Sequence, residues 1–196
     1  MSASYPDRYP KSSSASPADV ESTCSKYGLD KAEFEELHKG SVAAKATAYC
    51  PYSQFRVGAT ILAAGGVYIS GANVENAAYP VGTCAERVAF GKAVTEGHKK
   101  FKAVAVATDI APPASPCGMC RQLLVLLYPV AHRRDICHVL ICGTNLGSIR
   151  EFCDLSTPIL MFDKNGDYLV QKLEELLPLS FGPEALPPPG RPGVSA

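Results

Sequence analysis

The chain has 196 residues, of which 46% are hydrophobic, enough for one compact domain with a buried core. Its 19 basic and 19 acidic side chains cancel, so no net positive charge is available to hold a nucleic-acid backbone. No segment reaches the roughly 18 apolar residues of a membrane span, and residues 1–10 lack the layout of a secretory signal. We therefore expect a cytoplasmic protein whose partner is a small molecule, not a nucleic acid or a membrane.

Both ends of the chain have the composition of disordered tails. Residues 1–28 are rich in Ser and Pro, and Val20 is the single Val, Leu or Ile among them. Residues 187–196 begin with a run of Pro and Gly. The folded domain is expected to span residues 29–186.

Helical and strand patterns alternate between the two tails. A capping-box spacing at 30–33 predicts a helix start, and alternating or β-branched runs predict strands. Gly-Gly at 65–66 and Asn-Gly at 165–166 predict hairpin turns. In chain order we expect a helix from 30, strands at 54–62 and 67–73, a helix at 84–94, a strand at 101–108, a helix from about 117, strands at 157–162 and 168–170, and a helix at 173–177. This order predicts an α/β sandwich around one mixed sheet.

Three cysteines carry the clearest chemical signal. Cys117 and Cys120 form a CxxC at the expected start of one helix, and Cys84 lies at the start of another. Helix N-termini favour thiolates, so two converging helix starts could hold three sulfurs around one zinc ion. Three protein ligands leave the fourth tetrahedral position for water, which is typical of a catalytic zinc site.

Glu86 follows Cys84 by two residues and could move protons at such a site. Zinc lowers the pKa of bound water toward about 7, which provides hydroxide at neutral pH. A C-x-E followed by P-C-x-x-C matches the zinc-deaminase pattern, in which a Cys-only ligand set is allowed. Two alternatives stay open. Thr83 and Glu86 also have capping-box spacing, and the CxxC could belong to a structural four-cysteine site or a redox pair.

The other cysteines and the four histidines show no ligand spacing. We expect the cysteines to be small buried residues or incidental thiols, and the histidines to lie at the surface. These residues are Cys24, Cys50, Cys137, Cys142, Cys153, His38, His98, His132 and His138.

Four separated motifs, in this order, resemble the small homotetrameric cytidine deaminases of pyrimidine salvage. The motifs are Tyr52–Ala59 (YSQFRVGA), Gly71–Pro80 (GANVENAAYP), Cys84–Arg87 (CAER) and Pro116–Gln122 (PCGMCRQ). The resemblance covers most of residues 29–186, and residues 176–183 also look like the animal and fungal forms. It implies an α/β/α sandwich around one mixed sheet and a homotetramer with active sites at subunit interfaces.

The resemblance implies a hydrolase that acts on the C–N bond of a cyclic amidine. Cytidine or deoxycytidine would become uridine or deoxyuridine, with release of ammonia. Hydroxide held by one zinc ion per subunit would attack C4 of the pyrimidine, while Glu86 would protonate N3 and then the leaving amino group. The implied zinc ligands are Cys84, Cys117 and Cys120.

Roles for the surrounding side chains follow from the same resemblance. Asn73 and Glu75 would hold the ribose 3′-hydroxyl, because an amide and a carboxylate together offer donors and acceptors. A free nucleoside suits such a grip better than a nucleic-acid chain. Phe55 would pack beside the pyrimidine, and Phe181 of a neighbouring subunit would cover it. Tyr79 would reach an adjoining subunit's site.

Three further residues are implied near the substrate and the metal. Ala85 would contact the substrate, and Gln122 would lie in the layer of residues behind the metal ligands. Arg87 would donate hydrogen bonds to the cysteine sulfurs, since three thiolates on one Zn²⁺ leave a negative charge that a nearby cation offsets. In the alternative interpretation, Arg87 lies on a solvated helix face, and Phe55 and Phe181 are core aromatics.

The chain departs from the family pattern in one place. About 25 extra residues, 125–149, interrupt the helix after Leu124, and family-like sequence resumes at Arg150. A core helix tolerates an insertion poorly, and Pro129 must break it. One hypothesis is an unspliced intron or gene-model error, in which case mature transcripts will lack the segment. In the other, residues 125–127 complete the helix and the rest loops out or adds an edge strand.

Three functions are compatible with these residues. The first is the nucleoside deaminase described above. The second is a deaminase of another aminopyrimidine compound, such as a nucleoside antibiotic, against which Asn73, Glu75 and Phe181 argue. The third is an inactive, zinc-stabilised homo-oligomer that acts as a binding module because the insertion blocks catalysis.

Overall fold

A mixed six-stranded sheet forms the centre of the computed structural model, which describes residues 11–121 and 153–180. The strand order is β1-β6-β5-β4-β2-β3, and β4 and β5 are its one parallel pair. The strands are β1 (Ser12–Ser13), β2 (Val57–Ala63), β3 (Tyr68–Ala72), β4 (Phe101–Thr108), β5 (Pro158–Phe162) and β6 (Asp167–Lys172).

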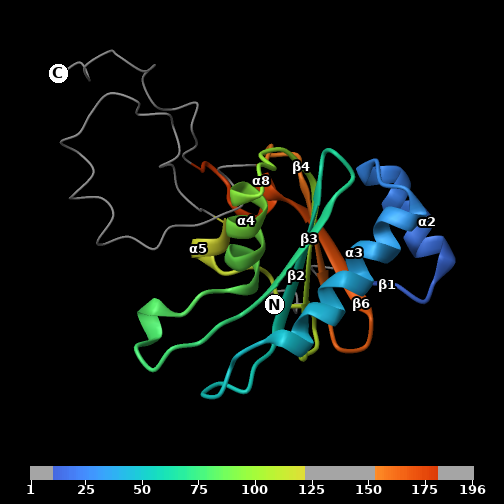
Figure 1. Ribbon diagram of the computed structural model, residues 1–196. Helices are drawn as coiled ribbons and strands as arrows, with labels where there is room; N and C mark the ends of the chain where they lie inside the picture. Colours follow the sequence, from blue (N-terminus) through green and yellow to red (C-terminus); the bar gives the residue numbers. More distant parts are fainter. Residues whose placement is uncertain (1–10, 122–152, 181–196) are drawn as a thin grey trace, which may run out of the picture.

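Helices cover both faces of this sheet (Figure 1). One face carries α2 (Pro17–Tyr27) and α3 (Lys31–Ala44); the other carries α4 (Ala85–Thr95), α5 (Gly118–Arg121) and α8 (Leu173–Leu176). Two 3₁₀ turns, η1 (Lys45–Thr47) and η2 (Tyr79–Val81), lie in the connections. The predicted α/β/α sandwich around one mixed sheet is confirmed. Within the described part of the chain, no helix has both the length and the apolar character needed to cross a membrane.

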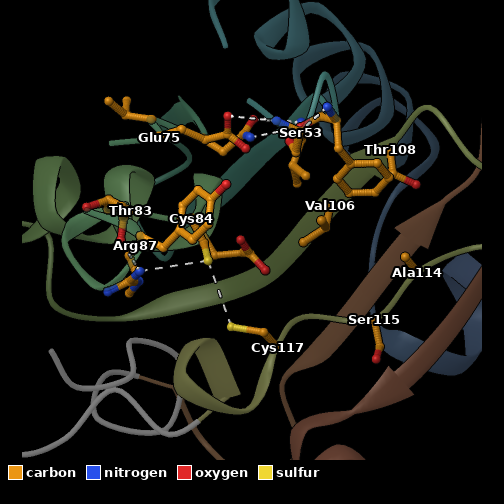
Figure 2. Close-up of a pocket in the computed structure, with 17 residues that line it drawn as sticks. Ser53, Glu75, Thr83, Cys84, Arg87, Val106, Thr108, Ala114, Ser115 and Cys117 are labelled. Carbon is orange, nitrogen blue, oxygen red and sulfur yellow. Dashed lines mark hydrogen bonds between the residues drawn. The ribbon is translucent and has the colours of Figure 1, made fainter. Parts of the chain in front are cut away.

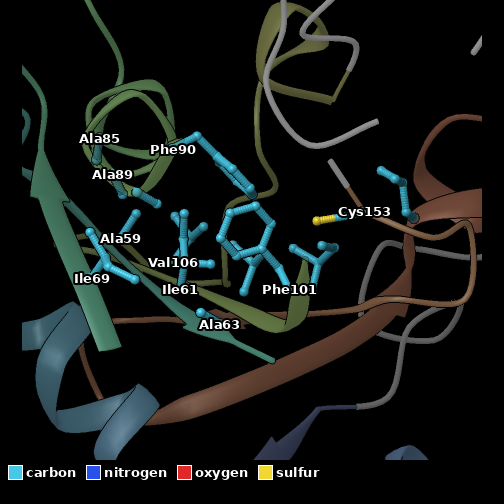
Figure 3. Close-up of a cluster of buried hydrophobic side chains, with 14 of the residues drawn as sticks. Ala59, Ile61, Ala63, Ile69, Ala85, Ala89, Phe90, Phe101, Val106 and Cys153 are labelled. Carbon is cyan, nitrogen blue, oxygen red and sulfur yellow. The ribbon is translucent and has the colours of Figure 1, made fainter. Parts of the chain in front are cut away.

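The central strands bury both of their faces, because successive side chains enter two separate cores. On β4, Val104 and Val106 pack toward α4, whereas Ala103 and Ala105 pack toward α3. Figure 3 shows the first of these cores, in which Phe90 of α4 lies over the sheet. The sheet therefore forms a rigid platform beneath the first turn of α4.

Close contact between β3 and α4 sets the position of that first turn. A Cβ atom on Gly71 would lie 2.5 Å from the Ala89 backbone nitrogen and 2.8 Å from the Ala85 carbonyl oxygen. Only glycine leaves room for this approach, so a side chain at position 71 would push α4 away from the sheet.

The predicted elements agree with the observed ones within a few residues, and the strand at 101–108 agrees at both ends. The capping box is present: Asp30 Oδ1 accepts from Glu33 N at 2.7 Å, and Glu33 Oε2 accepts from Asp30 N at 2.9 Å. At the 165–166 turn, Gly166 has a φ of 82°, as a hairpin glycine allows. On α3, Ser41 is buried whereas its apolar neighbour Val42 is exposed.

The prediction of a disordered tail over residues 1–28 is wrong for residues 11–28. Residues 17–27 form α2, which begins at Ser16, whose side chain accepts from Asp19 N. It has Pro17 in its first turn and ends at Gly28 in the left-handed conformation, with a φ of 67°. These are standard signals for the start and end of a helix, which a count of large apolar residues does not register.

A narrow stripe of three buried side chains holds α2 against the rest of the domain. Val20 and Cys24 are buried with residues of α3 and the sheet. The Thr23 hydroxyl lies 2.8 Å from the Tyr168 hydroxyl of β6, and both side chains are buried. The folded domain therefore begins before residue 29, whereas the predictions for 125–149 and 187–196 lie outside the described residues.

His38 differs from its expected surface position. Its ring is half-buried and stacks on Phe162, with 4.3 Å between ring centroids. Burial, together with the charge of Lys45, lowers the pKa of His38. The residue is therefore part of the packing between α3 and the sheet.

Thr23→Val tests whether α2 is an integral part of the fold. The substitution keeps the side-chain volume but removes the hydrogen bond between the Thr23 and Tyr168 hydroxyls. The free energy of unfolding should therefore fall by about 1–2 kcal/mol. Urea denaturation provides the measurement, with Ser25→Ala on the exposed side of α2 as the control. Equal stability of the two variants would contradict the packing of α2.

Candidate metal centre and cavity

Three sulfur atoms meet beside the first turn of α4. The Sγ atoms of Cys84, Cys117 and Cys120 all lie within 4.8 Å of one another. The Cys84–Cys117 distance is 3.8 Å and the Cys117–Cys120 distance is 3.4 Å. Across residues 11–121 and 153–180, no other group of three or more His, Cys, Asp or Glu side chains converges in this way.

This arrangement fits a zinc ion. A Zn–S bond of about 2.3 Å in tetrahedral geometry puts sulfurs about 3.8 Å apart, close to the two measured separations. Within the described residues the cluster contains three ligand atoms, so a bound metal would keep one position for a non-protein ligand. Cys120 is buried and Cys117 is exposed, which leaves the centre accessible from one side.

The three thiols form hydrogen bonds with one another, and these bonds shift their pKa values. Hydrogen bonding with Cys120 and Cys84 lowers the pKa of the Cys117 thiol. The same contact with Cys117 raises the pKa of Cys84 and of Cys120. Zinc binds thiolates, so the cluster releases protons when metal binds, and metal affinity is expected to rise with pH.

Cys84 is the N-cap residue of α4, but its side chain makes no capping hydrogen bond. A capping box between Thr83 and Glu86 would require Thr83 to be the N-cap residue, and the helix begins one residue too late for that. The structure therefore does not show the alternative role of Glu86 as a capping residue. Glu86 is instead the second residue of α4.

Glu86 is buried, with 3% of its surface exposed, yet it lines a cavity of about 550 Å³. Burial raises the pKa of this carboxyl. A buried acid with a raised pKa, next to a candidate metal centre, has the properties of a proton-transferring group. The cavity is lined by Ser53, Phe55, Val57, Asn73, Val74, Glu75, Tyr79, Gly82, Thr83, Cys84, Glu86, Arg87, Val106, Thr108, Ala114, Ser115 and Cys117.

Arg87 lies against the sulfur cluster, not on a solvated helix face. Its Nη2 donates to the Gly82 carbonyl oxygen at 2.8 Å and to Cys84 Sγ at 3.8 Å (Figure 2). Its Nε is buried and makes no hydrogen bond within the described residues. A guanidinium in this place offsets negative charge on the thiolates.

Asn73 and Glu75 line the opposite side of the cavity and also hold one of its walls. Asn73 accepts from Val57 N at 2.8 Å and donates to the Phe55 carbonyl at 2.9 Å. Glu75 Oε2 accepts from Tyr52 N at 3.0 Å and from Ser53 N at 3.2 Å. The hydrogen bond with Ser53 lowers the pKa of Glu75, so this carboxyl is ionised.

The remaining predicted site residues fall in different places. Phe55 is half-buried and lines the cavity, so it is not a core aromatic. Tyr79 lies at the cavity mouth and is 75% exposed. Ala85 packs with its side chain in the core under α4 and does not line the cavity. Phe181 and Gln122 lie outside the described residues.

Several cavity residues were not predicted. Val106 and Thr108 end β4, and Ala114 and Ser115 precede the CxxC. Val106 and Thr108 match the pattern of a buried strand, and the pairing of β4 with β2 places Thr108 opposite Val57 in the cavity wall. Ala114 and Ser115 match the pattern of a loop. The location of Thr108 at the end of a central strand is the one signal that could have indicated it.

An α/β/α sandwich with three converging cysteines and a buried glutamate defines a zinc-binding deaminase domain. The family model for the "Cytidine and deoxycytidylate deaminase zinc-binding region" matches residues 31–131. The chain belongs to this cytidine deaminase family.

Individual relatives agree with this assignment. A curated cytidine deaminase of Sporosarcina psychrophila is 39% identical over 154 residues, which cover 79% of this chain and 95% of the relative. The crystal structure of cytidine deaminase from Burkholderia pseudomallei has 31% identity and a TM-score of 0.61, over 75% of this chain and 98% of its own. Blasticidin-S deaminase of Bacillus cereus is 31% identical over 137 residues, covering 66% of this chain and 79% of its own.

Cys117→Ala tests the metal centre directly. Loss of one of three thiolates should weaken zinc binding by more than the roughly 10- to 100-fold typical of losing a supporting residue. Zinc affinity is measured by competition with a chelator. Cys50→Ala removes a free thiol outside the cluster and serves as the control. Equal zinc affinity in the two variants would contradict the three-cysteine centre.

Proposed function

We propose that this protein is a zinc-dependent hydrolase that converts cytidine and deoxycytidine to uridine and deoxyuridine, with release of ammonia. The observation that carries the proposal is the buried Glu86 in one cavity with the sulfur cluster. The family membership of the chain supports the same chemistry. One zinc ion per subunit, held by Cys84, Cys117 and Cys120, would supply the Lewis acidity that makes water nucleophilic at neutral pH.

Glu86 moves the protons in this proposal. It takes a proton as water adds to C4 of the pyrimidine and delivers it to N3. It then takes the proton of the new C4 hydroxyl and transfers it to the exocyclic amino group. The C4–N bond breaks, ammonia leaves and C4 becomes a carbonyl. The raised pKa suits this alternation, because the carboxyl must both accept and donate a proton near neutral pH.

The opposite wall of the cavity would bind the sugar. Ionised Glu75 would accept a further hydrogen bond from a ribose hydroxyl, because the backbone N–H groups of Tyr52 and Ser53 both donate to the same oxygen, Oε2. The Asn73 amide lies beside it, and Phe55 would pack against the pyrimidine. A grip on the 3′-hydroxyl favours a free nucleoside over a polynucleotide.

We also propose a homotetramer with active sites at the subunit interfaces. Support comes from an apolar rim at and near the cavity mouth, since large exposed hydrophobic side chains gathered in one region commonly mark an interface. In this arrangement Tyr79 reaches an adjoining site, and Phe181 of a neighbouring subunit covers the pyrimidine. The rim consists of Tyr49, Tyr52, Val74, Tyr79 and Val81.

Pyrimidine salvage in the cytoplasm is the expected setting of this activity. All six cysteines in the described part of the chain are free thiols, as in a reducing compartment. The similarity to blasticidin-S deaminase makes an aminopyrimidine antibiotic the second candidate substrate. Asn73 and Glu75 favour the nucleoside, since both face the cavity with groups suited to a sugar.

Glu86→Gln tests the proton transfer. Rates of cytidine loss, followed by ultraviolet absorbance, should fall by about 10²- to 10⁴-fold because the amide cannot exchange protons. Glu96→Gln changes an exposed residue after the same helix and should keep full activity.

No turnover of cytidine by zinc-loaded wild-type protein would contradict the proposed function. Turnover of blasticidin S in its place would support the second candidate. Activity that returns only after deletion of residues 125–149 would show that this segment blocks catalysis.

Glu75→Gln, assayed with two substrates, tests the sugar site. We expect kcat/KM for cytidine to fall about 10- to 100-fold, the usual value of a hydrogen bond to a charged group. With 3′-deoxycytidine the same substitution should have little effect, because the hydroxyl partner is absent. An equal loss with both substrates would mean that Glu75 acts only by holding the wall at Tyr52 and Ser53.

A further inference from the structure

We propose that Arg121 is a positioning residue that holds the Cys117–Cys120 turn in its metal-binding geometry by tying it to α8. The inference rests on the zinc site of the proposed function, but it concerns how that site is built and not the reaction. It assigns a role to a side chain that is not among the residues lining the cavity and that donates its hydrogen bonds to oxygen atoms.

Three hydrogen bonds to oxygen atoms define the role of Arg121. Its Nε donates to the Pro116 carbonyl at 2.7 Å, and its Nη2 donates to Ser115 Oγ at 2.6 Å. Its Nη1 donates to the Leu176 carbonyl at 2.9 Å. The first two partners immediately precede Cys117 in the chain, so the guanidinium fixes the segment that leads into the metal ligand.

The backbone of Arg121 completes a closed loop around Cys117. Arg121 N donates to the Cys117 carbonyl at 3.0 Å, which forms the single described turn of α5. The side chain of the same residue returns to Pro116, one position earlier. Arg121 therefore holds Cys117 with one main-chain hydrogen bond and one side-chain hydrogen bond to the preceding residue. The other metal ligand of this turn, Cys120, is the residue directly before Arg121 in the chain.

The position of the two cysteines at the start of α5 explains why such bracing is useful. The first backbone N–H groups of a helix have no partner within the helix, so its first turn is held less firmly by backbone hydrogen bonds than the interior is. Contacts from a side chain such as Arg121 make up for this. Two sulfurs 3.4 Å apart require a fixed turn, because a small rotation of the turn would move one of them out of reach of a metal.

The third hydrogen bond connects the turn to the core. Leu176 ends α8, whose first residue, Leu173, is fully buried in the core under α4. That core also contains Ala85, the residue after the third ligand, Cys84. Arg121 thus connects the CxxC turn to the same hydrophobic core that holds the start of α4.

The planar fork of arginine suits these partners better than lysine does. Its donors lie at fixed angles and can reach three acceptors at once, whereas an ammonium group is a point charge on a flexible stem. Arg121 also differs from Arg87, which donates to a sulfur and changes the charge of the centre. Loss of Arg121 should therefore alter metal affinity through geometry.

Zinc competition with a chelator tests this role without any assay of turnover. Arg121→Gln should bind zinc about 10- to 100-fold more weakly than wild type, and Arg121→Lys should recover only part of that loss. All variants are compared at a temperature at which circular dichroism shows them folded. Lys102→Gln removes an ion pair with Glu33 on the α3 side of the sheet and should keep wild-type zinc affinity.

Unchanged zinc affinity in a destabilised Arg121→Gln protein would overturn the proposal, because Arg121 would then stabilise only the fold. If that variant fails to fold, Ser115→Ala removes one of the three bonds and should weaken zinc binding by a smaller factor. Unchanged affinity in Ser115→Ala would then overturn it. Wild-type protein that binds no zinc would refute the proposed function instead, so the two failures are distinct.

Discussion

The meeting of two separate segments at three sulfur atoms is the constraint on which the rest of the structure depends. Cys84 and Cys117 are 33 residues apart in the chain, yet their sulfurs lie 3.8 Å apart. For that to happen, α4 must begin at the sheet and the CxxC turn must approach from the end of β4. Gly71 permits the first contact, and the hydrogen bonds of Arg121 support the second.

The same packing gives Glu86 its chemical character. Because α4 lies so close to the sheet, its second residue is buried beside the cavity instead of capping the helix in solvent. Burial raises the pKa of the carboxyl, and the cavity gives a substrate access to it. The acid, the sulfurs and the guanidinium of Arg87 all come from one helix start and one turn. A nucleoside deaminase needs little more than these groups and a place for the sugar.

Much of this was predictable from local sequence. Alternating patterns indicated the sheet and its helices, and the spacing of Cys84, Glu86 and the CxxC indicated the metal centre. Helix α2 was not predictable from composition, because Val20 is the single Val, Leu or Ile in residues 1–28. Cys24 and Thr23 complete a narrow stripe, which only the presence of β6 makes useful.

Tertiary roles were less accessible from sequence. Asn73 and Glu75 were expected to bind a sugar, but their bonds to the backbone of residues 52–57 depend on two loops meeting. Ala85 was expected at the substrate, but its side chain enters the core because it follows the N-cap. Arg121 lies in the Pro116–Gln122 motif, but its role depends on contacts that the motif does not show: two with the nearby Pro116 and Ser115, and one with the distant Leu176 carbonyl.

X-ray absorption spectroscopy of the zinc-loaded protein tests the central claim most directly, because it counts the atoms bound to the metal. The structure predicts three sulfurs at about 2.3 Å and one oxygen or nitrogen at about 2.0–2.2 Å, as in a catalytic site with an open position. A shell of four sulfurs would contradict the account. It would mean a closed structural site, with a further cysteine in the place where water must react.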